Sequence, residues 1–155
     1  MVWKIAIGLI GLLFAGCGSL ERDNPLDPKA SIFIGDLETA IIGFWSLENE
    51  EENQVYNFKS DGSVDLSDYS NPGGGEVDRN ATYPQTLLIR FSGTYTLGGT
   101  LLRISFSESL TNTTEVEPPP VPSDARIVEI IPQGRNVLTF KDNAGERSYT
   151  RFTRF

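Results

Sequence analysis

The sequence contains no histidine and only one cysteine, Cys17, in 155 residues. Without histidine, the chain lacks the commonest general base and the commonest protein metal ligand, and it cannot form the nucleophile–histidine pairs of many hydrolases. A single cysteine can form no disulfide within the chain, and zinc sites built from several cysteines are excluded. We therefore expect no enzyme activity, no metal site and no cofactor.

Positive charge is also scarce. Thirteen lysines and arginines stand against 21 aspartates and glutamates, which gives a net charge of -8, and no stretch of the chain forms a basic stripe. A surface of this sign repels the phosphate backbone of nucleic acids. We expect no nucleic-acid partner.

The apolar run near the start is too short to span a bilayer, which needs about 20 residues. Residues 5–14 are apolar apart from glycines. A short start with one positive charge, at Lys4, precedes them, and the small residues Ala15 and Gly16 follow. This order is typical of a secretory signal peptide.

The tetrapeptide "FAGC" at residues 14–17 resembles the lipobox of bacterial lipoproteins. The resemblance implies cleavage before Cys17, attachment of a diacylglycerol to its thiol and acylation of the new amino terminus. Several acyl chains give a stable anchor, whereas a single chain binds a membrane only marginally. The alternative is an ordinary signal peptide that happens to contain a cysteine.

This interpretation divides the chain into three parts. Residues 1–16 are a signal peptide that is removed, residues 17–34 are a lipidated tether, and residues 35–155 are one folded domain. The tether, with two prolines and mixed charges, has no helical face or strand pattern. No aspartate follows Cys17 directly, which favours the outer membrane over the inner one. We expect a lipid-anchored protein of the bacterial cell envelope, facing the periplasm or the cell surface.

From about residue 40 onward, short runs rich in Val, Ile, Thr, Tyr and Phe alternate with turn signals. The pattern predicts an all-β domain with eight strands and one helical turn before them, at residues 35–40. Eight short strands with local connections are typical of an up-and-down antiparallel barrel or a sandwich. The expected strands are residues 41–47, 54–59, 63–69, 85–97, 100–107, 125–131, 136–141 and 146–155.

Three motifs in this domain resemble the lipocalin-like lipoproteins of bacteria. They are Gly43-Phe44-Trp45, the hairpin "YNFKSDGSV" at 56–64, and the final "LTFKDNAGERSYTRF" at 138–152 with its Tyr-x-Arg. The resemblance implies an eight-stranded barrel in which Arg151 of the last strand covers Trp45 of the first and closes one end. Gly43 would let the chain turn sharply into the first strand. We expect structural roles for these three residues, and no catalytic one.

Side chains at every second strand position should face the barrel interior, although strand 125–131 has apolar residues on both faces. The topology also places both long loops, residues 70–84 and 108–124, at one end, which we expect to be an open mouth with an acidic rim. Such a rim repels anions and tolerates neutral or cationic ligands. The candidate ligand contacts are Tyr56, Phe58, Phe91, Tyr95, Phe106 and Phe140.

Two functions remain open at this stage. The barrel could bind a small hydrophobic ligand, neutral or cationic, among these aromatic residues. Alternatively, the same side chains could fill the barrel and leave no cavity, because eight strands enclose little more than their own side chains. The acidic loops would then contact an envelope protein or a glycan.

Overall fold

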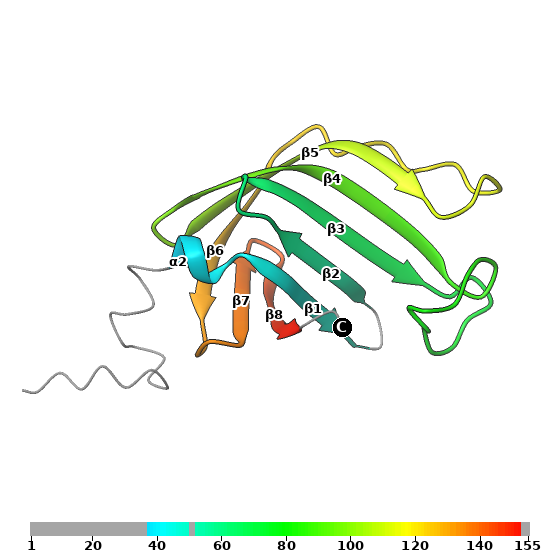
Figure 1. The fold of residues 1–155 in the computed structure, drawn as a ribbon, viewed down its shortest axis with the longest axis horizontal. Coiled ribbons are helices and arrows are strands. Elements are labelled where there is room, and N and C mark those ends of the chain that lie inside the picture. The colour runs from blue at the N-terminus through cyan, green and yellow to red at the C-terminus, as the bar shows by residue number, and fades with distance from the viewer. Residues whose placement is uncertain (1–36, 50–51, 153–155) are drawn as a thin grey trace, which may run out of the picture.

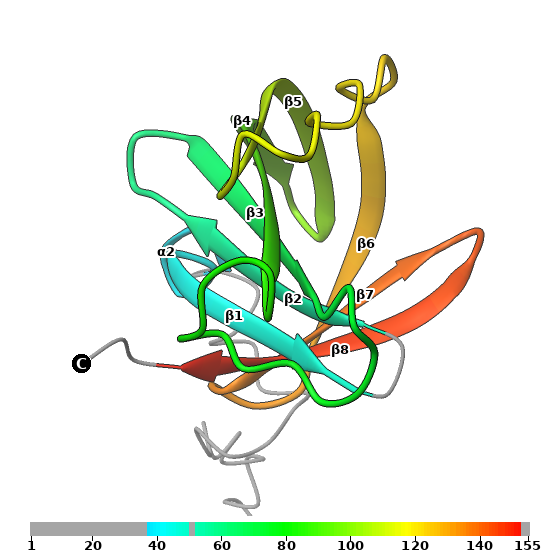
Figure 2. The same cartoon turned by 90° about the vertical axis from the view of Figure 1, so that its right-hand side faces the viewer.

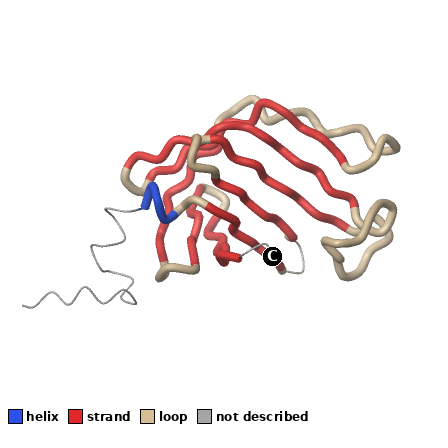
Figure 3. Tube along the Cα trace, in the orientation of Figure 1, coloured by secondary structure: helices blue, strands red, loops and turns tan. Residues whose placement is uncertain are grey.

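The computed structural model describes residues 37–49 and 52–152, and these form a closed antiparallel barrel in which each strand pairs with the next and β8 pairs with β1. Figures 1 and 3 show the strands wrapping around one interior, with a single helical turn, α2 (Leu37–Ala40), beside them. The predicted up-and-down barrel is confirmed. Its strands are β1 (Gly43–Glu48), β2 (Asn53–Phe58), β3 (Ser63–Ser70), β4 (Leu87–Gly98), β5 (Leu101–Thr111), β6 (Arg126–Pro132), β7 (Val137–Asp142) and β8 (Gly145–Phe152).

The barrel forms because apolar residues recur at every second position of the strands, so that one face of each strand is buried in the interior. In β6 the interior positions are Val128 and Ile130, both 1% exposed, which settles the orientation that the sequence left ambiguous. Glu129 lies on the outer face, where its register partners are Leu101 and Lys141. The buried core comprises Leu37, Ile41, Trp45, Leu47, Tyr56, Phe58, Val64, Leu66, Leu102, Ile104, Val128, Ile130, Leu138, Phe140 and Tyr149.

Strand β5 is longer than the sequence predicts. We expected it to end at residue 107, but it continues to Thr111, which pairs with Ile89 of β4. The register shifts between Ser92 and Gly93. This irregularity lets the two strands stay paired over residues 108–111, which the sequence analysis assigned to a loop. A β-bulge of this kind increases the local twist and bends the strand. The β4–β5 pair therefore reaches further towards the open end than the sequence suggested.

The pairing of β5 with β6 is short by comparison. Only Leu101–Ile104 pair with β6, opposite Arg126–Glu129. Beyond Ile104, β5 is held by β4 alone in the part of the chain that the structure describes. The far ends of β3, β4 and β5 consequently form an extension whose inner face continues past the closed ring of strands (Figures 1 and 2).

The two ends of the barrel differ as the topology predicts. The short turns after β2, β4 and β6 lie at the end where α2 packs, and the connections after β1, β3, β5 and β7 lie at the other. Figure 1 shows the long loops at residues 71–86 and 112–125 on the side opposite α2. We call these the closed end and the open end. The predicted signal peptide and tether, with Cys17, lie outside the described residues, as do the last three residues of the chain.

Candidate functional site

The closed end is sealed by Trp45 and Arg151. These residues are register partners on β1 and β8, and the guanidinium carbon of Arg151 lies 4.5 Å from the centre of the Trp45 ring. A guanidinium over an indole gains cation–π attraction of about 1 kcal/mol. The sequence analysis expected this pair, and the structure brings the two side chains together.

Backbone carbonyls after α2 complete this seal. Trp45 Nε1 donates a hydrogen bond of 2.7 Å to the carbonyl oxygen of Ile41, and Arg151 donates to the carbonyl oxygens of Ile42, at 3.2 Å, and Ala40. Gly43 has a φ of 124°, a conformation that other residues rarely adopt, so it provides the turn from α2 into β1. The role of these residues is structural.

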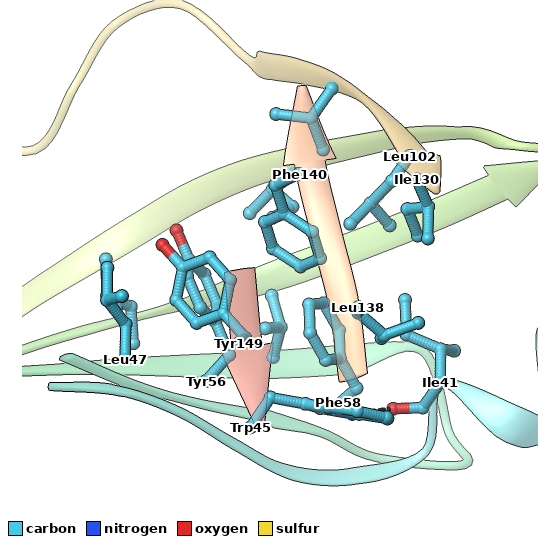
Figure 4. Packing of buried hydrophobic residues seen from close by; sticks show 14 of the residues in the cluster. Ile41, Trp45, Leu47, Tyr56, Phe58, Leu102, Ile130, Leu138, Phe140 and Tyr149 are labelled. Carbon is cyan, nitrogen blue, oxygen red and sulfur yellow. Dashed lines mark hydrogen bonds between the residues drawn. The ribbon is translucent and has the colours of Figure 1, made fainter. Parts of the chain in front are cut away.

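Aromatic side chains fill the barrel next to this seal (Figure 4). The ring of Tyr56 lies 5.5 Å from that of Phe58 and 5.6 Å from that of Phe140, and Phe58 meets Tyr95 edge-on at 5.0 Å. Tyr149 adds a fifth ring, 4.7 Å from Phe140. Centroid separations of 4.5–7 Å are those of directly packed aromatic pairs. Four of the six predicted ligand contacts therefore pack against one another in the closed half.

The remaining two predicted contacts lie nearer the open end. Phe91 on β4 and Phe106 on β5 are only partly buried, they pack against the edge of the core, and their ring centroids are 5.5 Å apart. Phe91 is the register partner of Leu66 on one side and of Ser109 on the other. Of the six candidates, Tyr56, Phe58 and Phe140 are buried in the closed half, and Tyr95 is partly buried at its edge. Phe91 and Phe106 are partly accessible on the inner face of the β3–β5 extension.

We call the second region the open-end face and define it by Asp68, Ile89, Phe91, Phe106 and Ser109. All five occupy inward positions of β3, β4 and β5. Asp68 pairs with Ile89, and Phe91 pairs with Ser109. The hydroxyl oxygen of Ser109 is buried without a hydrogen-bond partner. Such an atom is costly in a folded protein, and sequence reasoning did not identify it.

A layer of polar groups lies between the aromatic core and the open end. Arg126 donates a 2.6 Å hydrogen bond from Nη1 to the hydroxyl oxygen of Tyr56 and a 3.1 Å bond from Nη2 to Asp142 Oδ2. Arg147 Nε donates to both carboxylate oxygens of Glu52, at 2.9 and 3.1 Å. Arg126 therefore forms an ion pair with Asp142, and Arg147 forms a close one with Glu52 and a longer one, at 4.0 Å, with Asp142.

The same layer continues to Asp68 through side-chain hydrogen bonds. The Tyr149 hydroxyl donates to Gln54 Oε1 at 3.3 Å, and Gln54 Nε2 donates to Asp68 Oδ2 at 3.5 Å. The second contact is at the outer limit of a hydrogen bond. Figure 4 shows the hydroxyl groups of Tyr56 and Tyr149 at the same end of their rings, which is the end that meets this layer. We define the polar layer as Glu52, Gln54, Asp68, Arg126, Asp142, Arg147 and these two hydroxyls.

The ionisation of the layer follows from these contacts. Burial raises the pKa of Asp68, and the charge of Glu52 raises it further. The weak hydrogen bond from Gln54 lowers this pKa, but by less. Burial also acts on Asp142, but the Ala144 amide and the charges of Arg126 and Arg147 outweigh it and hold the pKa of Asp142 below its usual value. Burial raises the pKa of the Tyr56 hydroxyl despite Arg126.

Arg79, in the loop that follows β3, is a cation at the end that we expected to be acidic. Its guanidinium lies on the outer face of the barrel. It donates hydrogen bonds to Ser46 Oγ at 2.8 Å, to the Leu47 carbonyl at 3.2 Å and to Asn53 Oδ1, and it lies 5.5 Å from the centre of the Tyr69 ring. These contacts fasten the loop of residues 71–86 against β1 and β2.

Two shallow pockets lie elsewhere on the described surface. One is at the β1–β8 seam, lined by Ser46, Leu47, Glu48, Ser148, Thr150 and Phe152. The other is lined by residues of β5, β6 and β7, among them the exposed Leu101 and Ile127. None of the six predicted ligand contacts lines either pocket. Among the residues described, no three histidine, cysteine or carboxylate groups gather in a way that could hold a metal ion.

The fold and these contacts define a class of protein: a closed eight-stranded up-and-down antiparallel barrel, sealed at one end by a Trp–Arg pair, with its long loops at the other. Comparison of the sequence with models of protein families, with curated proteins and with solved structures found no match. Within the described ranges, no helix has the length and apolar character needed to cross a membrane.

Proposed function

We propose that this protein is a lipid-anchored binding protein of the bacterial cell envelope, and that a small hydrophobic ligand, neutral or cationic, binds on the open-end face. The observation that carries this proposal is the contrast between the two groups of aromatic residues. Tyr56, Phe58 and Phe140 are at most 1% exposed, whereas Phe91 and Phe106 remain partly exposed on an inward surface. A partly exposed aromatic pair beside polar groups is a typical lining of a ligand site.

The charge around the open end supports the choice of ligand. The loops there carry Glu76, Asp78, Glu115 and Glu117, and the chain as a whole has a net charge of -8. A surface of this sign lowers the local concentration of anions and raises that of cations. Free fatty acids and phosphates are therefore disfavoured as ligands relative to neutral or cationic compounds.

A titration with a neutral hydrophobic fluorophore tests this proposal, using the chain from Ser19 onward together with Phe91→Ala. Loss of one ring from a ligand contact removes roughly 1.5 kcal/mol or more, so we expect about a tenfold weaker affinity for the variant. The matched control is Phe152→Ala. That residue belongs to the Phe44–Phe152 pair at the β1–β8 seam, with ring centroids 5.6 Å apart, and it lines the pocket there.

The outcomes separate the candidate sites. Saturable binding that Phe91→Ala weakens and Phe152→Ala leaves unchanged supports the open-end face. Weaker binding in Phe152→Ala alone would move the ligand to the seam pocket and contradict the proposal. The absence of saturable binding to a cooperatively folding protein would also contradict it.

The second candidate function is a filled barrel that contacts an envelope protein or a glycan through its acidic loops. The close packing of Tyr56, Phe58, Phe140 and Tyr149 in the closed half favours it, because that half offers no space among these rings. It differs from the first proposal in its prediction for small hydrophobic compounds, which a filled barrel would not bind. Neither candidate requires enzyme activity, a metal ion or a cofactor, and we propose none.

A further inference from the structure

The polar layer contains one more negative charge than positive. Its carboxylates are those of Glu52, Asp68 and Asp142, and its guanidinium groups are those of Arg126 and Arg147. Glu52 pairs with Arg147 at 2.9 Å and Asp142 pairs with Arg126 at 3.1 Å. Three carboxylates and two guanidinium groups leave one negative charge without a positive partner in the layer. Because Glu52 and Asp142 each form an ion pair with an arginine, this negative charge is that of Asp68.

Asp68 has little that compensates this charge. From β2, Gln54 offers a single long contact of 3.5 Å, and Tyr56 offers an aromatic ring with its hydroxyl. The charge of Glu52, which acts on the carboxylate, has the same sign. From β4, its register partner is the apolar Ile89. A partly buried charge without a counter-ion destabilises a fold. A residue that costs stability in this way is often retained for a function.

The groups around Asp68 indicate which kind of ligand would bind there. Phe91 lies diagonally across β3 and β4 from Asp68, which corresponds to about 7 Å, and Phe106 packs against Phe91 on the far side. Ser109, the register partner of Phe91 on β5, has a buried hydroxyl oxygen with no partner. The inner face therefore presents a carboxylate and two partly exposed rings within the span of three adjacent strands.

From this arrangement we infer that the open-end face binds a protonated amine that carries an aromatic or other apolar group, with the ammonium on Asp68 and the apolar group on Phe91 and Phe106. The ammonium supplies the positive charge that the layer lacks. A cation near an aromatic face gains further attraction. This inference rests on the proposed function, since it specifies the ligand class of the same face.

Calorimetric titration of the full chain in detergent tests this inference with two probes of nearly equal shape. 2-Phenylethylamine is protonated at neutral pH, and 2-phenylethanol is neutral. Blank titrations into detergent alone correct for partitioning. We expect the amine to bind the wild-type protein at least tenfold more tightly than the alcohol. The variant Asp68→Asn should remove this preference and leave the affinity for the alcohol within about twofold.

The matched control is Asp65→Asn. Asp65 lies on the same strand but faces outward, where it pairs with Lys59 at 2.9 Å, so its loss should leave the amine preference unchanged. As a second readout, amine binding to the wild-type protein should weaken as the pH falls and Asp68 takes up a proton, while alcohol binding stays constant. The groups that face Asp68 are Gln54 and Tyr56 from β2, Glu52 before it and Ile89 from β4.

Two results would overturn the inference, and they differ in what else they overturn. If both probes bind equally, or if Asp68→Asn keeps the amine preference, Asp68 is not the amine site, but the open-end face remains a ligand site. If neither probe binds, the ligand function of the face fails as well, and the filled-barrel function takes its place.

Discussion

Single residues at the two ends of the barrel have opposite effects on its stability. At the closed end, Arg151 forms a cation–π contact with Trp45 and hydrogen bonds with two carbonyl groups, so that its charge is well compensated. At the open end, the Asp68 carboxylate has no counter-ion among the residues that the structure describes. This difference agrees with a stabilising role for the closed end and a binding role for the open end. Substitution of Arg151 and of Asp68 should therefore change the free energy of unfolding in opposite directions.

We predict that Arg151→Ala lowers the free energy of unfolding by about 2–4 kcal/mol, since it removes the cation–π contact and two charge-assisted hydrogen bonds. Urea denaturation measures this loss. Arg154→Ala, three residues further along the sequence, is the comparison, and we expect it to lower stability less than Arg151→Ala does. Equal losses in the two variants would contradict the assignment of Arg151 as the residue that closes the barrel.

We predict that Asp68→Asn raises the free energy of unfolding at neutral pH, because it replaces an uncompensated carboxylate with a neutral amide. The pKa of Asp68 is higher in the folded protein than in the unfolded chain. The wild-type protein therefore gains stability relative to the variant as the pH falls and Asp68 takes up a proton, so the advantage of the variant should shrink in acid.

Urea denaturation at neutral and acidic pH provides the test. The control, Asp65→Asn, should change stability in the opposite direction, because it breaks the ion pair with Lys59. A loss of stability in Asp68→Asn at neutral pH would show that the Asp68 carboxylate is stabilised by its surroundings in the folded protein. The charge of Asp68 would then be no indication of a ligand site.

At the scale of elements, the β4–β5 pair determines the shape of the open end. The two strands stay paired through the irregularity at Gly93, where the backbones come very close. A Cβ atom on Gly93 would lie 2.0 Å from the carbonyl oxygen of Ser105 and 2.7 Å from the Cα atom of Phe106. Real Cβ atoms do not approach backbone atoms to such distances, so only glycine fits here without a shift of the strands.

We predict that Gly93→Ala destabilises the fold by about 2–4 kcal/mol, because the new methyl group must push two backbones apart. Gly98→Ala is the control from the same strand, since a Cβ there meets nothing within 4 Å, and it should be close to neutral. Thermal unfolding compares the two variants directly. Equal stability of Gly93→Ala and the wild-type protein would mean that the strands are not in close contact at this position.

The sequence predicted those features of the strands that depend on neighbouring residues, and it missed those that depend on pairing with a distant strand. The alternation of apolar residues and the turn signals predicted the number of strands, their order and the barrel, and the Gly-x-Trp and Tyr-x-Arg motifs indicated the Trp45–Arg151 pair. The extension of β5 to Thr111 was missed because it depends on pairing with β4 across a register shift. Residues 108–111 read locally as the start of a loop.

The polar layer was missed for a related reason. Asp68 lies two positions from Leu66 and so shares its inward face, but polar residues near strand ends usually face solvent, and nothing local marks them as buried. Arg126, Asp142 and Arg147 come from three different strands and meet only in the folded barrel. The sequence did identify Phe91 and Phe106 as inward, but could not separate them from the four aromatics that pack together in the closed half.

For the whole molecule, we propose that a barrel with one ligand-binding end is joined to a membrane anchor at Cys17. The described part of the barrel begins at Leu37, beside the closed end and opposite the open-end face. A tether that joins the closed end leaves the open-end face free of the attachment point.

We predict that Cys17→Ser, expressed in a bacterial host, abolishes the partition of the protein into the membrane fraction, because a serine cannot receive the thioether-linked lipid on which the anchor depends. Metabolic labelling with a fatty acid and membrane fractionation measure this directly. The barrel variant Arg151→Ala serves as a control and should still be labelled. Labelling of Cys17→Ser at the wild-type level would contradict the lipoprotein assignment.

The most direct test of the central claim, that the ligand binds at the open end while the closed half stays packed, is a heteronuclear NMR titration of the chain from Ser19 with 2-phenylethylamine. We predict chemical-shift changes at the backbone amides of Phe91, Phe106 and Ser109. The indole N–H signal of Trp45, the only tryptophan from Ser19 onward, should not shift. Shifts centred on Trp45 and Phe58, or none at the open-end face, would contradict it.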